Sequence, residues 1–416
     1  MNEKQIKHKG WLVTISGFII SISLGILYSW SIFKTEIEQK IKSGIPNTFD
    51  WSLSSLNDPY SVSVLVFSFS MIITGKIQDK IGPRIAIIIG GFFISLGLFL
   101  LSQSTDYIIW VLGFGIMLGI GVAFCYASIT PAAIKWFSPE KTGLIAGIIV
   151  SGLALSSVYI APLSTYLIGK FGIHSTMLYY SIAFFLVIVI FSFFISNPPP
   201  NYLVTPSHQN KKLKYKQTEK SPLDFLKTGM FYKIWFIYFI GAGVGLMVFS
   251  FINDLVKTGL QELAFWGVII IALGNASGRI VGGALSDKLG SKKTLLIMFI
   301  FQLILMIIST LITIINHYHP ATLLILSTLI GFAYGTNLAI FPHITKELYG
   351  LKNFGVNYGI MFVAWGLGGS LLSRISQMLY SNTNSFSSSF ITAIFLLLIG
   401  IYLILKLKMS NRNMQL

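Results

Sequence analysis

Residues 75–84 read G-K-I-Q-D-K-I-G-P-R, and residues 283–292 read G-A-L-S-D-K-L-G-S-K. Both segments follow a long apolar run, and the spacing of Gly, Asp, Gly and a basic residue is the same in each. Tyr126 and Tyr334 are separated by the same number of residues as the two segments. The chain is therefore built from two similar halves, an arrangement typical of membrane transporters.

Each residue type in this repeated segment has a physical reason. Gly75 allows a neighbouring helix to approach closely, and Gly82 permits a tight turn with positive φ. Asp79 and its counterpart Asp287 can lie against the positive end of a neighbouring helix. Arg84 can anchor the end of its helix at the membrane surface and pair with an acid.

The composition excludes an ordinary soluble domain. Hydrophobic residues make up 54% of the 416 residues and charged residues only 11%, whereas soluble domains are about 25% charged. Runs of about 20 apolar residues can cross a bilayer, and they must do so as helices. The sequence has twelve such runs, which predicts an all-α membrane protein with twelve transmembrane helices in two pseudo-symmetric six-helix bundles. The predicted spans are 11–33, 59–79, 84–103, 108–134, 143–169, 176–196, 231–256, 262–286, 292–315, 320–346, 354–380 and 386–408.

Basic residues predict the orientation in the membrane. Most of the 30 Lys and Arg residues lie in the termini and in the loops of one side. The basic side of a membrane protein is cytoplasmic, so we expect a multi-pass protein of the cell membrane with both termini in the cytoplasm. The loops of the other side hold few basic residues, namely Lys34, Lys40, Lys42, Lys170 and Lys257.

The longest polar stretch on the basic side divides the chain. Residues 197–228 begin with three prolines and continue with a sequence rich in Lys, Gln and Ser. This composition is typical of a flexible linker. We expect a six-helix bundle over 1–196, a cytoplasmic linker over 197–228 and a second six-helix bundle over 229–416.

Arg279 is the most informative basic residue. It lies in G-N-A-S-G-R-I-V-G-G, deep inside a predicted helix, where a charge is costly and usually faces a cavity. A guanidinium group suits a carboxylate, so we expect a site for a small organic anion. The simpler alternative is an arginine whose long side chain extends to the cytoplasmic surface. Asn275, one turn away, can orient the guanidinium, bind the substrate or only join two helices.

Several aromatic residues also lie in the middle of predicted helices. A phenol can donate a hydrogen bond to a carboxylate while its ring forms a wall of a small pocket. The alternative for each is packing, or anchoring at the membrane interface. The residues that we expect to line the cavity with Arg279 and Asn275 are Tyr28, Tyr126, Tyr159, Tyr334 and Trp365.

The repeated segment resembles the motif that members of the major facilitator superfamily carry between helices 2 and 3, with a weaker copy between helices 8 and 9. The resemblance covers almost the whole chain and implies the major facilitator fold. In that family the motif concerns gating between inward-open and outward-open states and does not contact the substrate. The resemblance therefore implies a gating role for Gly75, Asp79, Gly82, Arg84 and Asp287.

Three further segments are similar to the oxalate/formate antiporter-like and monocarboxylate transporter branch. They are L-Y-S-W-S-I-F at 27–33, Y-A-S-I-T-P-A-A-I-K-W-F at 126–137 and N-A-S-G-R at 275–279. The resemblance implies that Arg279 binds the substrate carboxylate and that the aromatic residues named above line the cavity.

The chain differs from the prototype oxalate exchanger, which has a Lys in helix 11 where this sequence has Trp365. Two cations suit a dianion, and one cation suits a monoanion. We therefore expect a secondary active transporter of monocarboxylates such as lactate, pyruvate or formate, working by alternating access. An oxalate/formate-type antiporter is the alternative.

The sequence leaves the coupling open. Proton symporters of this branch often have an Asp one turn before the Arg, where this chain has Asn275. Asp254, near the outer end of its span, is either a proton site or only a helix-end residue. Transport is then coupled either to a proton or to a counter-transported carboxylate. We expect a monomer embedded in the lipid bilayer. We expect it to use no cofactor or metal and to bind no nucleic acid. An enzyme or a non-transporting membrane receptor is the rival class, but we find no nucleophile–base pair and no large soluble domain in the sequence.

Overall fold

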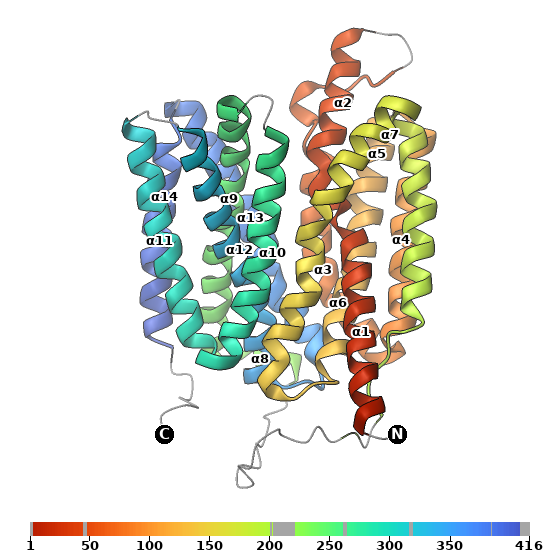
Figure 1. Cartoon of the computed structure of the whole chain (residues 1–416), viewed down its shortest axis with the longest axis vertical. Helices are drawn as coiled ribbons and strands as arrows, with labels where there is room; N and C mark the ends of the chain where they lie inside the picture. Colours follow the sequence, from red (N-terminus) through yellow and green to blue (C-terminus); the bar gives the residue numbers. More distant parts are fainter. Residues whose placement is uncertain are drawn as a thin grey trace.

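The structure of the chain is a computed structural model that describes residues 3–44, 48–199, 202, 221–260, 264–315, 319–383 and 385–407. The side chains of residues 3–7, 139, 249–268 and 320 lie outside this description. The described residues form helices and connecting turns, without a strand. The helices stand upright in two groups, one from the first half of the chain and one from the second (Figure 1).

The helices of the first group cover the region before the linker. They are α1 (Glu3–Leu24), the turn η1 (Gly25–Ser29), α2 (Trp30–Ser43), η2 (Leu53–Ser55), α3 (Asp58–Ile81), α4 (Pro83–Gln103), α5 (Tyr107–Trp110), η3 (Val111–Met117), α6 (Leu118–Ile134), η4 (Pro139–Lys141) and α7 (Thr142–Ser192). A short helix, α8 (Pro222–Leu226), precedes the second group. That group consists of α9 (Gly229–Leu260), α10 (Ala264–Leu289), α11 (Ser291–Ile315), α12 (Pro320–Tyr349), α13 (Phe354–Thr383) and α14 (Ser387–Leu405).

Eleven helices of the described residues are long and apolar enough to cross a membrane. One of them, α7, has 51 residues and contains a non-helical residue, Gly172, with φ 80° and ψ 167°. A straight helix of that length would extend about 75 Å, whereas the hydrocarbon core is only ~30 Å thick. The helix α7 therefore crosses twice and turns at Gly172 (Figure 1). The predicted all-α fold with twelve crossings is confirmed.

The first predicted span ends too early. The helix continues as α2, which projects beyond the neighbouring helices, so Lys34, Lys40 and Lys42 lie on a helix and not in a loop (Figure 1). Glu36 and Glu38 pair with Lys40 and Lys42 at N–O distances of 3.6 and 2.7 Å. Such pairs at i and i+4 stabilise an exposed helix, and a search for apolar runs does not detect them.

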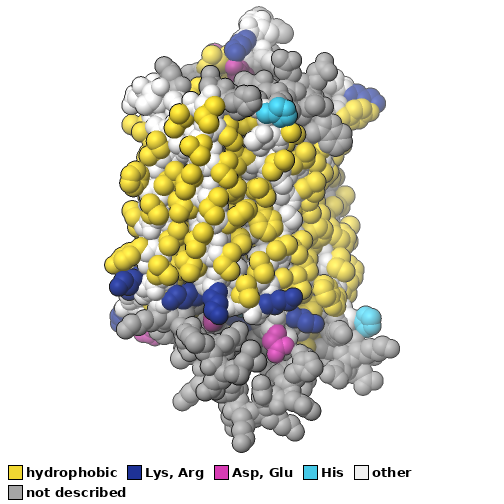
Figure 2. Space-filling view, turned by 60° about the vertical axis from the view of Figure 1, so that its left-hand side comes forward, with side chains coloured by type: hydrophobic (Ala, Val, Ile, Leu, Met, Phe, Trp, Pro, Cys, Tyr) yellow, Lys and Arg dark blue, Asp and Glu magenta, His cyan; other side chains and the backbone are white. Residues whose placement is uncertain are grey.

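The outer surface has an apolar belt with Lys and Arg side chains at its lower edge (Figure 2). The first residues of α1 and the last residues of α14 lie at this lower end (Figure 1), which we call the basic end. An apolar belt with basic residues along one edge is typical of a protein that spans a bilayer. Exposed basic residues at this end are Lys76, Lys80, Arg84, Lys288 and Lys293.

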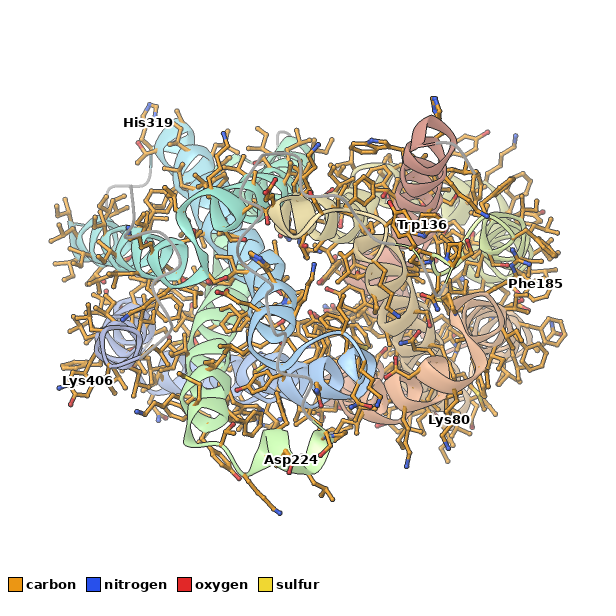
Figure 3. The ribbon with its side chains drawn as sticks, turned by 90° about the horizontal axis from the view of Figure 1, so that it is seen from below. Lys80, Trp136, Phe185, Asp224, His319 and Lys406 are labelled. Carbon is orange, nitrogen blue, oxygen red and sulfur yellow. The ribbon has the colours of Figure 1, made fainter. Side chains whose placement is uncertain are left out.

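The two groups meet mainly through two pairs of helices. The helix α3 packs against α13, and α7 packs against α10. Seen from the basic end, Lys80 of the first group and Lys406 at the end of α14 lie on opposite sides of the molecule (Figure 3). The repeated segments end α3 and α10, so both copies lie where the two groups meet.

Candidate functional site

Glycines in α10 place Arg279 where the two groups meet. Gly274, Gly278 and Gly282 recur every four residues and share one face of the helix. A β-carbon on these residues would lie 2.3, 2.0 and 2.3 Å from atoms of α12, so the two helices pack directly on each other. Asn275 and Arg279 share the adjacent face, from which Arg279 reaches α7.

Arg279 is fully buried, with 0% of the residue exposed. Its Nε donates to Oδ1 of Asn275 at 3.0 Å, and its Nη1 donates to the carbonyl oxygen of Val150 on α7. Its Nη2 has no hydrogen-bond partner among the described residues. The side chain therefore does not extend to the surface. An unpartnered buried donor on a charged group is costly, so Nη2 is a place where an anion would be strongly stabilised.

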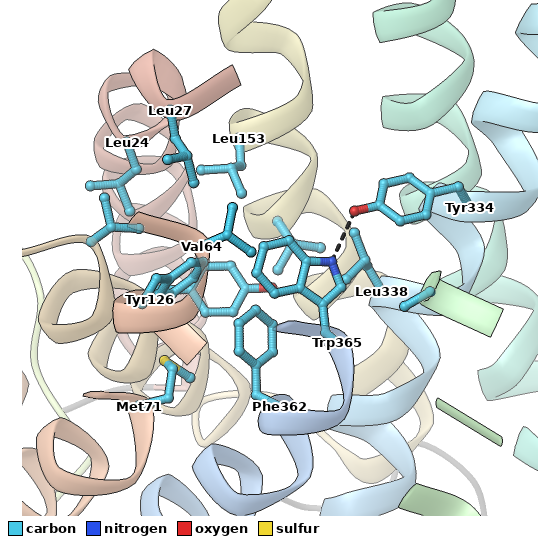
Figure 4. Packing of buried hydrophobic residues seen from close by; sticks show 14 of the residues in the cluster. Leu24, Leu27, Val64, Met71, Tyr126, Leu153, Tyr334, Leu338, Phe362 and Trp365 are labelled. Carbon is cyan, nitrogen blue, oxygen red and sulfur yellow. Dashed lines mark hydrogen bonds between the residues drawn. The ribbon is translucent and has the colours of Figure 1, made fainter. Parts of the chain in front are cut away.

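Three helical segments bring tyrosines to Arg279, and a fourth brings a tryptophan. Tyr126 on α6 and Tyr334 on α12 lie close enough to interact electrostatically with the guanidinium. Tyr28 in η1 is half-buried and interacts with both of these phenols. Trp365 on α13 donates from Nε1 to the hydroxyl oxygen of Tyr334 at 2.9 Å (Figure 4). The indole N–H thus fixes the position of a tyrosine beside Arg279.

Tyr159 is placed differently from the other predicted tyrosines. Its hydroxyl donates to the carbonyl oxygen of Ile22 on α1 at 3.4 Å, and its phenol group lies close enough to Tyr180, also on α7, to interact with it electrostatically. Both neighbours belong to the first group of helices. The structure therefore brings Tyr28, Tyr126 and Tyr334 together with Arg279, and holds Tyr159 against the bend between α1 and α2.

The sequence analysis missed an aromatic layer beside the site. Phe362 on α13 lies 5.4 Å from Tyr126 between ring centroids, and Phe67 on α3 lies 5.6 Å from the same ring. Phe362 is next to Tyr126 in Figure 4. Tyr358 on α13 interacts with both Tyr126 and Tyr238 on α9. Phenylalanine in an apolar helix gives no signal of a site, but the polar segment V-N-Y-G around Tyr358 could have been noticed.

At the basic end, Asp287 joins the two groups. Its Oδ1 and Oδ2 accept hydrogen bonds from the backbone N–H groups of Gly143 and Leu144 at 2.7 and 2.8 Å. These groups belong to the first turn of α7, where unpaired N–H groups and the helix dipole favour a negative charge. Lys346 on α12 donates to the hydroxyl of Thr142 in the same turn. We call these contacts the Asp287 latch.

Asp79 makes the corresponding contact in the other direction. Its carboxylate accepts hydrogen bonds from the backbone N–H groups of Gly355 and Val356 in the first turn of α13. Gln78 donates to the same carboxylate. Lys135 at the end of α6 lies nearby; burial lowers the pKa of its amine, and the charge of Asp79 partly offsets that effect. We call these contacts the Asp79 latch.

The glycines of the repeated segment allow both latches to form. A β-carbon on Gly75 would lie 2.3 Å from the carbonyl oxygen of Gly355, and one on Gly283 would lie 2.1 Å from that of Gly143. Gly82 has a φ of 85° and Gly290 a φ of 83°, which confirms the predicted positive φ at the turn. The two groups therefore touch backbone to backbone at the basic end.

The sequence analysis allows the basic residue of the segment to pair with an acid, but in the structure it contacts backbone carbonyl groups instead. Arg84 donates from Nη2 to the carbonyl oxygen of Phe193 at 2.7 Å, at the end of α7. Lys292 donates to the carbonyl oxygens of Leu405 and Leu407 at 3.3 and 2.6 Å, at the end of α14. Carbonyl groups at a helix C-terminus lack partners within the helix. Each basic residue therefore ties two helices of its own group together.

Two other predictions concern Asp254 and metals. Asp254 lies in α9, in the part whose side chains are outside the described residues. Within the described residues, no group of three or more His, Cys, Asp or Glu side chains is arranged to hold a metal ion.

Comparisons with known proteins agree with this architecture. The chain is 23% identical over 384 residues to the oxalate:formate antiporter of Oxalobacter formigenes, covering 90% of this chain and 87% of the relative. It is 23% identical over 401 residues to monocarboxylate transporter 13 of Bos taurus, covering 94% and 87%. The fold is similar to that of the transporter FucP in its outward conformation, with a TM-score of 0.64, 14% identity and coverage of 94% and 98%. The sequence model of the family named Major Facilitator Superfamily matches residues 10–373 and 264–413, and the chain therefore belongs to this superfamily of membrane transporters.

Proposed function

We propose that the chain is a secondary active transporter of small organic monoanions, with monocarboxylates such as lactate, pyruvate or formate as substrates. The observation that carries this proposal is the buried guanidinium of Arg279, whose Nη2 has no partner among the described residues. None of the ion pairs within the described residues involves Arg279. A carboxylate is the group that best supplies the missing charge and hydrogen bond.

The polar groups around Arg279 favour a monoanion over a dianion. The guanidinium is the cation of this site, and Trp365 stands where a second cation would be needed. The indole N–H of Trp365 donates to Tyr334. Tyr126 and Tyr334 then offer phenol groups beside the guanidinium for the rest of a small substrate. The likeness to the oxalate:formate antiporter supports exchange of such anions as the second candidate activity.

The two latches support a gating role for the repeated segments. Asp79, Asp287 and their glycines join the two groups at the basic end, which must separate there to release a substrate. We propose that the basic end lies on the cytoplasmic side of the cell membrane, because basic residues are retained on that side. The structure then corresponds to a state closed toward the cytoplasm. Arg84 acts within its own group and supports the latch only indirectly.

The test is uptake of labelled lactate and labelled oxalate by purified variants in sealed vesicles. Losing a charge-assisted contact costs about 1.5–3 kcal/mol, so Arg279→Ala should lower lactate affinity roughly ten- to a hundredfold. Arg279→Lys keeps the charge but loses the planar donor pair, so we expect an intermediate effect. Normal lactate uptake by Arg279→Ala would contradict the proposal.

A second variant tests the count of charges. Trp365→Lys adds a cation and should shift preference from lactate toward oxalate. Trp365→Phe is the matched control, because it removes the hydrogen bond to Tyr334 without adding a charge. A parent protein that prefers oxalate would contradict monoanion selectivity and leave anion transport in place.

A further inference from the structure

The Asp287 latch contains a histidine that the Asp79 latch lacks. His343 on α12 places Nε2 3.8 Å from Oδ1 of Asp287. The spacing that separates Asp79 from Asp287 also separates Lys135 from His343, so the Asp79 latch has a lysine at the position where the Asp287 latch has a histidine. We propose that His343 and Asp287 form a proton-binding site that makes the Asp287 latch sensitive to pH at the basic end.

Hydrogen bonds determine which nitrogen of neutral His343 carries the proton. Nδ1 lies 2.8 Å from Oγ of Ser286 and 3.4 Å from Oγ of Ser291. Ser286 donates its own proton to the carbonyl oxygen of Gly283, and Ser291 donates to Oε2 of Glu347. Both hydroxyl oxygens can therefore only accept from Nδ1, so Nδ1 is the protonated nitrogen.

The unprotonated Nε2 therefore points a lone pair toward the carboxylate of Asp287. A lone pair and a carboxylate oxygen cannot form a hydrogen bond, and 3.8 Å is longer than a hydrogen bond of normal length. A proton on Nε2 converts this contact into a charge-assisted pair. The side chains of His343 and Asp287 are 13% and 5% exposed, so solvent screens the pair only weakly.

The proton favours the released latch. In the closed state, the charge of Asp287 is already balanced by the first turn of α7. When α7 moves away, those two N–H groups and the positive helix end leave with it, whereas α10 and α12 stay together. The potential at His343 then becomes more negative and its proton affinity rises. A ligand shifts an equilibrium toward the state that binds it more tightly, so protonation promotes opening of the basic end.

The other charged groups around His343 come from α11, α12 and the turn before α7. Lys346 is held at Thr142 of α7 while the latch is closed. Its charge close to the site opposes protonation of His343 in that state. Glu347 on α12 accepts from Ser291, and Lys292 is directed to the carbonyl groups of α14. The turn before α7 carries Glu140 and Lys141, one charge of each sign.

This inference does not depend on which substrate the protein carries, so it can be tested without a substrate. Spin labels on Lys80→Cys and Lys406→Cys, in a Cys125→Ser background, report the separation of the two groups at the basic end (Figure 3). Pulsed dipolar spectroscopy would be recorded on protein in nanodiscs between pH 8 and pH 5.5. We expect the ratio of the long-distance to the short-distance population to rise several-fold on acidification. One proton limits the rise to about tenfold per pH unit.

Three variants decide the outcome. His343→Gln should keep a constant ratio across the pH range, and His343→Lys should hold the long-distance population at every pH. The matched control is His174→Gln at the opposite end of the bundle, which should respond to pH like the parent. A parent ratio that does not change with pH, or a pH response that persists in His343→Gln, would overturn the proposal. Carboxylate uptake by Arg279 variants is a separate measurement, so the two proposals can fail independently.

Discussion

The Asp79 latch and the Asp287 latch use the same residue types and differ in their surroundings. Asp79 is exposed, with Gln78 beside it, and it receives its hydrogen bonds from the first turn of α13. Asp287 has a side chain that is only 5% exposed, and His343 and Lys346 lie close to it. The same carboxylate–helix contact is therefore more open to solvent in one half, where Lys135 is its basic neighbour, and less exposed in the other, where His343 and Lys346 lie beside it.

This difference indicates that the two copies of the segment do not contribute equally to closure. Charge interactions are stronger where water is excluded, so we expect the Asp287 latch to hold the basic end closed more firmly. The backbone contacts are nearly equal, because Gly75 and Gly283 approach their partners to similar distances. Steric substitutions should therefore act alike in the two halves, whereas charge substitutions should not.

The largest expected effect comes from adding one methyl group to the helix contacts. Gly75→Ala and Gly283→Ala would each place a β-carbon within 2.3 Å of a backbone oxygen across the interface. Closure of the basic end would be blocked, so we expect transport to fall at least about a hundredfold in both variants. Vesicle uptake measures this. The control is Gly169→Ala, because a β-carbon there meets nothing within 4 Å. Normal uptake by Gly283→Ala would show that the two groups do not close by this contact.

A smaller and unequal effect is expected for the two carboxylates. Neutralising a charge at a helix N-terminus costs about 0.3–1 kcal/mol at an exposed site and up to ~2 kcal/mol at a partly buried one. Asp287→Asn should thus raise the open population roughly tenfold, and Asp79→Asn only about two- to fivefold. Spin-label distances between positions 80 and 406 measure these populations. Substrate affinity should stay within a few-fold in both variants, and a larger shift in Asp79→Asn would reverse the comparison.

The smallest effect is expected for the basic residues of the segment. Arg84 and Lys292 each contact the end of a helix in their own group. Arg84→Gln and Lys292→Gln should each lower stability by about 0.5–1 kcal/mol, with a small decrease in the thermal midpoint. The open and closed populations should not change. A change in the spin-label distances comparable to that of Asp79→Asn would assign these residues to gating after all.

The sequence by itself determined the class of fold and singled out Arg279 as the centre of the proposed anion site. Apolar runs of bilayer length require helices, and the positions of the repeated segment require two similar halves. Arg279 could be singled out because a charge inside an apolar helix needs a partner or a cavity. The two crossings of α7 were predicted as separate spans on either side of Gly172, whereas α2 was missed because its amphipathic ion pairs do not form an apolar run.

Only the tertiary structure decided which residues meet. Tyr334 lies beside Arg279 and Trp365, and Tyr159 turns to α1, although all of these aromatic residues looked alike as isolated side chains in apolar helices. His343 became informative only when α12 was packed against α10, because its chemistry depends on Ser286, Ser291 and Asp287 from other segments. Hydropathy and residue type are properties of a single helix, whereas a hydrogen-bond partner is a property of two helices and of the rotation with which they pack.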